Sequence, residues 1–205
     1  MPETICLALT GASGMPYGFR LLESLLAAGC RVQLLYSQVA QVVARQELGI
    51  ELTSRASEAR RLLQERHRGL PGQVEVFGRE EWFAPVASGS NPPDAMVVCP
   101  CSMGTLAAIA QGLASKLIER AADVVLKEGR KLILVPRETP LSTIHLENML
   151  RLARAGAVIL PPCPGYYHQP RQVADLVDFV VARILDQLHV PHSLLPRWGD
   201  RVPQQ

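Results

Sequence analysis

The sequence predicts an α/β fold: a Rossmann-like three-layer sandwich around a mostly parallel, doubly wound sheet. Short apolar runs of strand length alternate with longer segments of helical periodicity, which is the pattern of repeated β-α units. The runs are continuously apolar, as expected for strands buried on both faces of a parallel sheet. Because 205 residues suit one domain, we expect a single domain over residues 1–205. We expect its Pro-rich C-terminal extension, from about 189 to 205, either to pack on a neighbouring subunit or to be partly mobile.

The first fifty residues are expected to form two β-α pairs. The first apolar run ends at Thr10, and Gly29 follows the first helix as a C-cap. Ser37 follows the second run in the N-cap position of the next helix, because its hydroxyl can accept a bond from a helix N–H group. The expected elements are strands at 5–9 and 32–36, and helices at 17–28 and from Ser37 to about 48.

The middle of the chain, residues 51–93, is less regular. A polar, Arg-rich segment is expected to form a surface helix, and a short apolar run a strand. A segment rich in Ser, Gly, Asn and Pro is expected to be a loop. These three segments are 54–68, 74–77 and 87–93, in that order.

The second half repeats the β-α alternation. Pro100 and Pro136 follow two apolar runs and are expected to end those strands, because proline cannot donate to the ladder. The expected strands are 95–99, 131–135 and 157–160, and the expected helices are 103–113, 116–128, 143–155 and 173–188.

Composition excludes several classes of function. A net charge of +2 is too small to favour a nucleic-acid partner. No stretch approaches the ~20 apolar residues of a membrane span, and the first residues do not form a signal peptide. The five cysteines are odd in number and lack redox or zinc spacing, so we expect reduced, buried thiols in a cytoplasmic protein. No metal-binding motif is present, which favours a metal-independent reaction.

Three of the expected strands are followed by small or hydroxyl residues. In doubly wound sheets, ligands bind outside the carboxyl ends of the strands. The glycine-rich segment 10–18 is either a nucleotide or phosphate site or only a tight turn, and its spacing is not that of a dinucleotide fingerprint. Ser37 is either a cap alone or also a ligand. The hydroxyl residues of 102–105 begin a helix, where backbone and side chains together can hold a phosphate.

Charged residues follow the next strand and line one helix. Arg137 and Glu138 are bracketed by prolines, and they form either a solvated pair or an anion site with a proton-transfer carboxylate. The face of the helix from 116 is either a solvated stripe or a cationic surface for a second phosphate, and its residues are Lys116, Arg120, Asp123 and Lys127. Tyr167, after the last strand, is either a packing aromatic or part of the site.

Several long segments together resemble one family, the flavin prenyltransferases of the UbiX type, which sit beside the phenylacrylic acid decarboxylase-associated flavoproteins. The resemblance covers nearly the whole chain and is weakest over 55–93. The segments that carry it are 10–14 with Tyr17-Gly18, 99–107, 117–124, 135–141, 145–149 and 175–179.

The resemblance implies a reaction, a cofactor and an assembly. Members join the dimethylallyl group of dimethylallyl phosphate to reduced FMN at flavin N5 and C6, without a metal. The prenylated FMN then serves a UbiD-type decarboxylase, including one in ubiquinone biosynthesis. The family fold assembles into a homododecamer with sites at subunit interfaces.

The resemblance also implies roles for individual residues. The positions that match FMN contacts are Gly11, Ala12, Ser13, Ser37, Ser102, Met103, Gly104, Thr105 and Arg137. The positions that match the prenyl phosphate site are Arg120, Lys127, Arg137, Tyr167, Arg183 and the C-terminal Trp198. The positions that match the chemistry are Ser13, Glu47, Lys127, Glu138 and Tyr167.

Three other functions fit the same fold. A flavin-dependent cysteine decarboxylase would use FMN as an oxidant, but such enzymes carry Pro-Ala-Ser-Ala-Asn-Thr where this chain has Pro100 to Thr105. A non-catalytic carrier would deliver FMN unchanged to a decarboxylase. An aromatic-acid decarboxylase would itself release CO₂.

Overall fold

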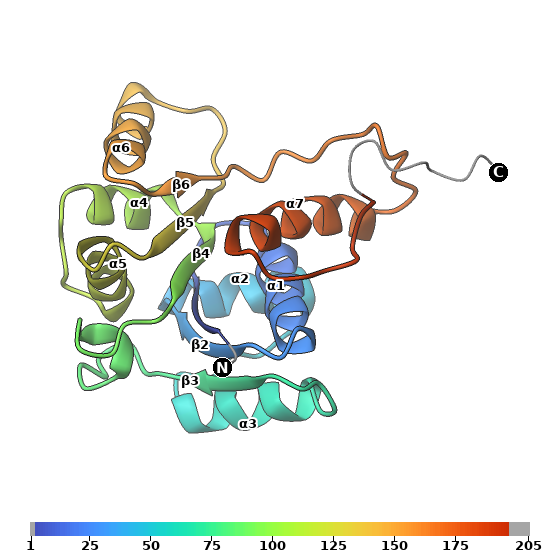
Figure 1. Ribbon diagram of the computed structural model, residues 1–205, viewed down its shortest axis with the longest axis horizontal. Helices are drawn as coiled ribbons and strands as arrows, with labels where there is room; N and C mark the ends of the chain where they lie inside the picture. The colour runs from blue at the N-terminus through green and yellow to red at the C-terminus, as the bar shows by residue number, and fades with distance from the viewer. Residues whose placement is uncertain (1–2, 197–205) are drawn as a thin grey trace.

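The computed structural model of the protein describes residues 3–196, which are built around one six-stranded sheet (Figure 1). The strand order is β3-β2-β1-β4-β5-β6, and every neighbouring pair is parallel. The strands are β1 Thr4–Leu9, β2 Arg31–Tyr36, β3 Gln73–Val76, β4 Ala95–Cys101, β5 Lys131–Pro136 and β6 Val158–Ile159. The predicted doubly wound α/β fold is confirmed, and the described sheet is parallel throughout.

Helices cover both faces of the sheet and make it the middle of three layers. The helices are α1 Met15–Ala27, α2 Gln38–Leu48, α3 Ala56–Arg66, α4 Met103–Ala110, α5 Leu117–Lys127, α6 Thr143–Arg154 and α7 Val173–Leu188, with a short 3-10 turn, η1, at Pro85–Ala87. One hydrophobic cluster joins the sheet to α1, α2, α3 and α7, and a second joins it to α4, α5 and α6. Figure 1 shows α7 lying alongside α1, across the sheet from α5.

Side-chain alternation along the strands divides the apolar residues between these two clusters. In β1, Ile5, Leu7 and Leu9 enter the first cluster, whereas Cys6 and Ala8 enter the second. Both faces of the strand are therefore apolar because both are covered by helices. This explains why the strand sequences are continuously apolar and lack the alternation of a half-exposed sheet.

Most element boundaries agree with the sequence prediction to within one or two residues. The prediction that Pro100 ends its strand is wrong, because β4 continues to Cys101. The pairing of β4 with β5 shifts register between Val98 and Cys101, so Pro100 lies in the irregular part of the ladder. The carbonyl of Pro100 still accepts a hydrogen bond from the N–H of Thr10 at 3.2 Å, so the missing proline donor does not end the strand.

The helix expected over 103–113 is shorter, because α4 ends at Ala110. Gly112 follows with a φ of +70°, a left-handed conformation that stops helical hydrogen bonding and that glycine adopts without strain. The shortened helix leaves a connection over 111–116, through which the chain reaches the beginning of α5.

The first part of the expected C-terminal extension packs on its own chain. Val190 is buried and Leu194 packs against the first hydrophobic cluster. The Lys131 ammonium at the beginning of β5 donates to the carbonyl of Gln187 at 2.5 Å. Residues 189–194 therefore continue the α7 layer.

Two chain-wide features bear on function. Among residues 3–196, no helix combines the length and apolar character that a membrane crossing requires. All five cysteines lie in this range and are unpaired: Cys6, Cys30, Cys99 and Cys101 are buried as expected, whereas the expectation of a buried thiol is wrong for Cys163, which is exposed.

The close contact of α1 with β4 depends on Gly18. A Cβ at this position would lie 2.5 Å from the carbonyl oxygen of Cys99 and 2.7 Å from Cδ2 of Leu9. We predict that Gly18→Ala destabilises the fold by roughly 1–3 kcal/mol, because backbone must move to admit the methyl group. Thermal unfolding measures the change. Gly104→Ala is the matched control, since a Cβ there has no neighbour within 4 Å, and an equal loss of stability in both variants would contradict the packing explanation.

Candidate active site

The sequence-predicted residues converge first at the carboxyl edge of the sheet, between β1 and β4. The strand order reverses direction here, and such a switch point is where doubly wound sheets bind ligands. Thr10, fully buried at the end of β1, joins the two strands: its hydroxyl donates to the carbonyl of Pro100 at 2.9 Å and accepts from the N–H of Ser102 at 2.7 Å. The loops after β1 and β4 are therefore fixed side by side.

The loop from β1 to α1 carries three of the predicted flavin positions. Gly11 lies so close to α2 that a Cβ there would stand 2.5 Å from Cγ1 of Val39, so only glycine fits. Ala12 is buried, whereas Ser13 is exposed. Between Gly11 and Gly14, Ser13 therefore carries the exposed hydroxyl of this loop.

Glu47, near the end of α2, holds the beginning of α1. Its carboxylate accepts hydrogen bonds from the N–H groups of Gly14 at 3.0 Å and Met15 at 2.8 Å. A carboxylate at a helix N-terminus satisfies free N–H groups and is stabilised by the helix dipole. Glu47 therefore fixes the loop that carries Ser13, a contact that its sequence position does not indicate.

Two further helices begin at the same edge and are capped by serines. The Ser37 hydroxyl accepts from the N–H of Ala40 at 3.1 Å at the start of α2. The Ser102 hydroxyl accepts from the N–H of Thr105 at 3.3 Å and donates to its hydroxyl at 3.0 Å at the start of α4. Because one cap satisfies only part of a helix N-terminus, first-turn N–H groups and the dipoles favour an anion here. Next in α4, Gly104 is exposed, whereas Met103 is buried.

A cavity of about 330 Å³ opens beside Ser37, between the ends of β2 and β3 and the beginning of α5. Apolar side chains such as Phe77 line it together with two cations, Arg79 and Lys116, and one carboxylate, Glu80. The cavity thus combines an apolar wall with side chains of both charges, beside the N-terminus of α2.

Arg137 and Glu138 follow β5, the next strand along the same edge. The N–H of Arg137 donates to the carbonyl of Cys101 at 3.2 Å, which places the pair beside the beginning of α4. Both side chains are exposed. A guanidinium and a carboxylate thus stand exposed at the carboxyl edge of the sheet.

The remaining charged residues of the predicted cationic face follow Lys116 along α5. The Arg120 guanidinium donates to the carbonyl of Ala87 at 3.0 Å and to Asp123 at 2.8 Å, and Lys127 pairs with Glu128. Lys127 ends α5 just before β5, whereas Arg137 follows β5. Six strand residues span about 16–20 Å, so Lys127 lies at the opposite edge of the sheet from Arg137.

Tyr167 and Arg183 belong to the α7 side of the molecule. The Tyr167 ring is exposed and meets the rings of Phe179 and His168 edge-on, with centroids 5.9 and 6.3 Å apart. The Arg183 side chain is exposed on α7 and pairs with Asp186 at 2.7 Å. Lys127 packs on the other face, because α5 belongs to the second hydrophobic cluster and α7 to the first.

One chain therefore brings together only part of the predicted site. The carboxyl edge gathers Gly11, Ala12, Ser13, Ser37, Glu47, Ser102, Met103, Gly104, Thr105, Arg137 and Glu138. Lys127 lies at the opposite edge, and Tyr167 and Arg183 lie on the α7 side. Trp198 falls outside the described residues.

Two contributions to the site are missed by sequence reasoning. Thr10 is predicted as the first residue of the glycine-rich segment 10–18, but the hydrogen bonds through which its hydroxyl joins β1 to β4 are not predicted. Residues 87–93 are predicted only as a loop, yet Gly89 lies so close to Lys127 that a Cβ would stand 2.5 Å from the lysine Nζ. The Ser/Gly composition of that loop is the one sequence signal for such a close approach.

The thiols next to the crevice are not nucleophiles. Burial raises the pKa of the Cys101 thiol to about 12 and also raises the pKa of Cys99, so both stay protonated at neutral pH. Within residues 3–196, no three His, Cys, Asp or Glu side chains cluster as metal ligands would. The groups available at the edge include hydroxyls, backbone N–H groups, Arg137 and the carboxylates of Glu47 and Glu138, with Arg79, Glu80 and Lys116 around the cavity beside Ser37.

Known proteins share this sequence and fold. The model of the Flavoprotein family matches residues 2–185. Flavin prenyltransferase UbiX of Pseudomonas aeruginosa is 56% identical over 200 residues, which cover 98% of this chain and 96% of that protein. The crystal structure of AnUbiX (PadA1) in complex with FMN and dimethylallyl pyrophosphate is 40% identical with a TM-score of 0.87, over 98% of this chain and 100% of that one.

A second solved structure is a dodecameric FMN-dependent Ubix-like decarboxylase from Escherichia coli O157:H7. It is 42% identical to this chain with a TM-score of 0.85, over 96% of this chain and 100% of that one. Sequence identity of this extent over nearly full length, on the same fold, leaves no doubt of common descent. The chain is a member of the Flavoprotein family and, within it, of the UbiX flavin prenyltransferases.

Proposed function

We propose that this protein is a flavin prenyltransferase that joins the dimethylallyl group of dimethylallyl phosphate to reduced FMN at N5 and C6. The observation that carries the proposal is the carboxyl edge of the sheet, where α2 and α4 begin at serine caps and the Arg137–Glu138 pair follows β5. A related structure contains FMN and dimethylallyl pyrophosphate together, which supports the pairing of a flavin with a prenyl donor.

We place the flavin mononucleotide at the carboxyl edge of the sheet. Gly104 leaves room over the first turn of α4, since a Cβ there has no neighbour within 4 Å. We assign the flavin phosphate to helix N-termini and hydroxyls, with Ser37 and Arg137 as the main side-chain contacts. The loops carrying Ser13 and Ser102 would hold the ring system, so that reduced FMN supplies its two nucleophilic positions, N5 and C6.

We further propose that neighbouring copies complete each site. Lys127 lies at the opposite edge from Arg137, and Tyr167 and Arg183 lie on another face, so a donor site that uses all four draws on more than one chain. The dodecameric relative supports this arrangement. We infer a homododecamer whose interfaces bring together Arg120, Lys127, Arg137, Tyr167 and Arg183 around the donor phosphate, and Trp198 is assigned to the same site from the family resemblance.

The assigned residues account for the chemistry that a prenyl monophosphate needs. The donor's C–O bond breaks and phosphate leaves with the electron pair, so cationic Lys127, Arg137 and Arg183 stabilise the growing negative charge. Glu138 or Tyr167 protonates the leaving phosphate. The proton lost from flavin C6 passes to Glu138, to the released phosphate or to Glu47. Holding both partners in one dry pocket recovers roughly 7–11 kcal/mol of the barrier.

The product has a defined use in this proposal. Prenylated FMN passes to a UbiD-type decarboxylase, as in ubiquinone biosynthesis, and the protein acts in the cytoplasm. Buried, unpaired thiols support a reducing compartment.

The first test is the mass of the flavin. We expect that anaerobic incubation of the protein with reduced FMN and dimethylallyl phosphate adds one dimethylallyl group per flavin, because FMN is consumed as a substrate. Mass spectrometry measures the product. Unchanged FMN would favour a carrier, recycled FMN with an oxidised substrate would favour a cysteine decarboxylase, and CO₂ release from an aromatic acid would favour a decarboxylase.

The second test concerns proton transfer. We predict that Glu138→Gln and Tyr167→Phe bind FMN normally but form prenylated FMN roughly 10²-fold more slowly, since each removes a group that moves a proton. Single-turnover kinetics and FMN titration separate the two effects. Glu65→Gln, an exposed carboxylate on α3, is the control, and wild-type rates in both site variants would remove these residues from the mechanism.

The third test concerns the donor phosphate. We predict that Arg183→Ala raises the KM for dimethylallyl phosphate roughly 10- to 100-fold, because a hydrogen bond to a charged group is lost, and leaves FMN affinity unchanged. Arg55→Ala is the matched control, since Arg55 forms the same kind of exposed ion pair with Glu58 at 2.8 Å. A fall in FMN affinity with an unchanged donor KM would place Arg183 at the flavin instead.

A further inference from the structure

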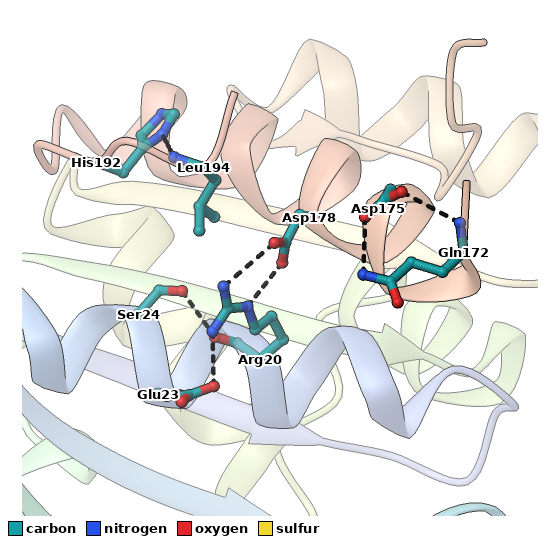
Figure 2. Close-up of polar contacts among 8 residues, drawn as sticks. All are labelled: Arg20, Glu23, Ser24, Gln172, Asp175, Asp178, His192 and Leu194. Carbon is teal, nitrogen blue, oxygen red and sulfur yellow. Dashed lines mark hydrogen bonds and ion pairs between the residues drawn. The ribbon is translucent and has the colours of Figure 1, made fainter. Parts of the chain in front are cut away.

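We propose that Arg20 and Asp178 form a positioning pair that sets Tyr167 for the prenyl donor by locking α7 onto α1. The inference rests on the proposed function, because it concerns the site to which Tyr167 is assigned. Neither Arg20 nor Asp178 belongs to the predicted site, and both are visible in Figure 2 at the contact of the two helices.

The pair is a two-point link between helices distant in sequence. The Arg20 guanidinium donates from Nε to Oδ1 of Asp178 at 2.6 Å and from its NH2 nitrogen to Oδ2 at 3.2 Å (Figure 2). Its remaining nitrogen donates to Glu23 at 2.8 Å. Hydrogen bonding to Asp178, and then to Glu23, raises the pKa of Arg20 above its usual value. Two parallel bonds fix distance and orientation together, which a single bond does not.

The pair is also more enclosed than an ordinary surface ion pair. The side chains of Arg20 and Asp178 are 34% and 24% exposed, whereas those of Arg55 and Glu58 are 78% and 41% exposed. Exposed pairs contribute little because water screens them, and enclosure strengthens the attraction and reduces the freedom of both side chains. The contact therefore stabilises one position and orientation of α7 relative to α1.

Phe179, which follows Asp178 in α7, connects the position of α7 to the Tyr167 side chain. Phe179 meets the Tyr167 ring edge-on at 5.9 Å, and it stacks with His168 at 5.4 Å and an interplanar angle of 13°. Neither ring nitrogen of His168 has a hydrogen-bond partner among residues 3–196, so within that range the His168 ring is held by packing. A Cβ at Gly165 would lie within 3.0 Å of both aromatic neighbours, Tyr167 and Phe179, which shows how closely the backbone approaches them.

The segment between Tyr167 and α7 is fixed at its far end as well. The Asp175 carboxylate accepts from the N–H groups of Arg171 at 2.8 Å and Gln172 at 3.1 Å, which caps α7. Tyr167 is thus attached to α7 through packing on Phe179 and through this cap. A shift of α7 along α1 would carry Tyr167 with it.

Helix α1 supplies the fixed reference. Its first turn is held by Glu47 and follows directly on the loop with Ser13. Gly18 presses it against β4. The Arg20–Asp178 pair therefore fixes the position of the Tyr167 segment relative to the sheet and to the loop that carries Ser13.

The experiment is a double-mutant cycle on the intact protein loaded with oxidised FMN, with the Kd for dimethylallyl phosphate as the readout. We expect Asp178→Asn to weaken donor binding roughly five- to tenfold, the coupling typical of groups in one contact network. FMN affinity should stay at the wild-type value. In a Tyr167→Phe background, Asp178→Asn should weaken donor binding no further, because Asp178 acts through Tyr167.

Glu23→Gln is the matched control. It removes the second carboxylate around the same guanidinium, 2.8 Å from it, but keeps the link to Asp178, so donor binding should be unchanged. Arg20→Lys is the milder second variant should Asp178→Asn fail to fold. It keeps the charge and loses the two-point geometry, and it should weaken donor binding in the same Tyr167-dependent way.

Three results would overturn the inference. The first is wild-type donor binding in both Arg20→Lys and Asp178→Asn. The second is an equal loss of FMN affinity and donor affinity in Asp178→Asn. The third is that the effects of Asp178→Asn and Tyr167→Phe on the donor Kd add fully in the double variant. Failure of the proposed function differs from failure of this inference, because the wild-type protein would then form no prenylated FMN from reduced FMN and dimethylallyl phosphate. In that case the inference would lose its basis as well.

Discussion

The buried hydroxyl of Thr10 is the contact on which the crevice depends. It joins the end of β1 to the end of β4 through one donated and one accepted hydrogen bond, and Thr10 itself is fully buried. A buried hydroxyl without partners is costly, and with both partners satisfied it holds two loops in one register. The first turns of α1 and α4 are fixed relative to each other by this contact, and every assignment for the flavin uses that arrangement.

The distribution of charge over the fold explains why one chain looks like an incomplete enzyme. Arg137 and Glu138 stand at the carboxyl edge, Lys127 at the opposite edge and Arg183 on α7. All four side chains are exposed, and Lys127 and Arg183 pair with carboxylates only one and three residues away. Water therefore solvates these charges unless another surface covers them. Apolar residues are exposed as well, including Ile144 and Leu150 on α6. Such surfaces are typical of chains that bury them against copies of themselves.

The sequence predicted the fold well because helix and strand periods, caps and turn residues all indicate the same elements. Ser37 and Ser102 cap the helices that their positions predict. Continuation of β4 past Pro100 was not predictable, because it depends on pairing with β5 and on a hydrogen bond from Thr10. The contact of Glu47 with α1 was beyond reach for the same reason: it joins residues 32 and 33 positions apart. Local patterns specify elements, whereas long-range contacts specify how their ends meet.

Glu47 has a consequence for which nucleotides the crevice accepts. In dinucleotide-binding folds, the N-terminus of the first helix seats a pyrophosphate. Here a carboxylate already fills that place, bonded to Gly14 and Met15. A dinucleotide would bring its bridging phosphates against a fixed negative charge, with the loss of two satisfied N–H groups if the carboxylate moved away. Glu47 thus occupies the N–H groups of Gly14 and Met15, which a bridging pyrophosphate would otherwise need at the start of the first helix.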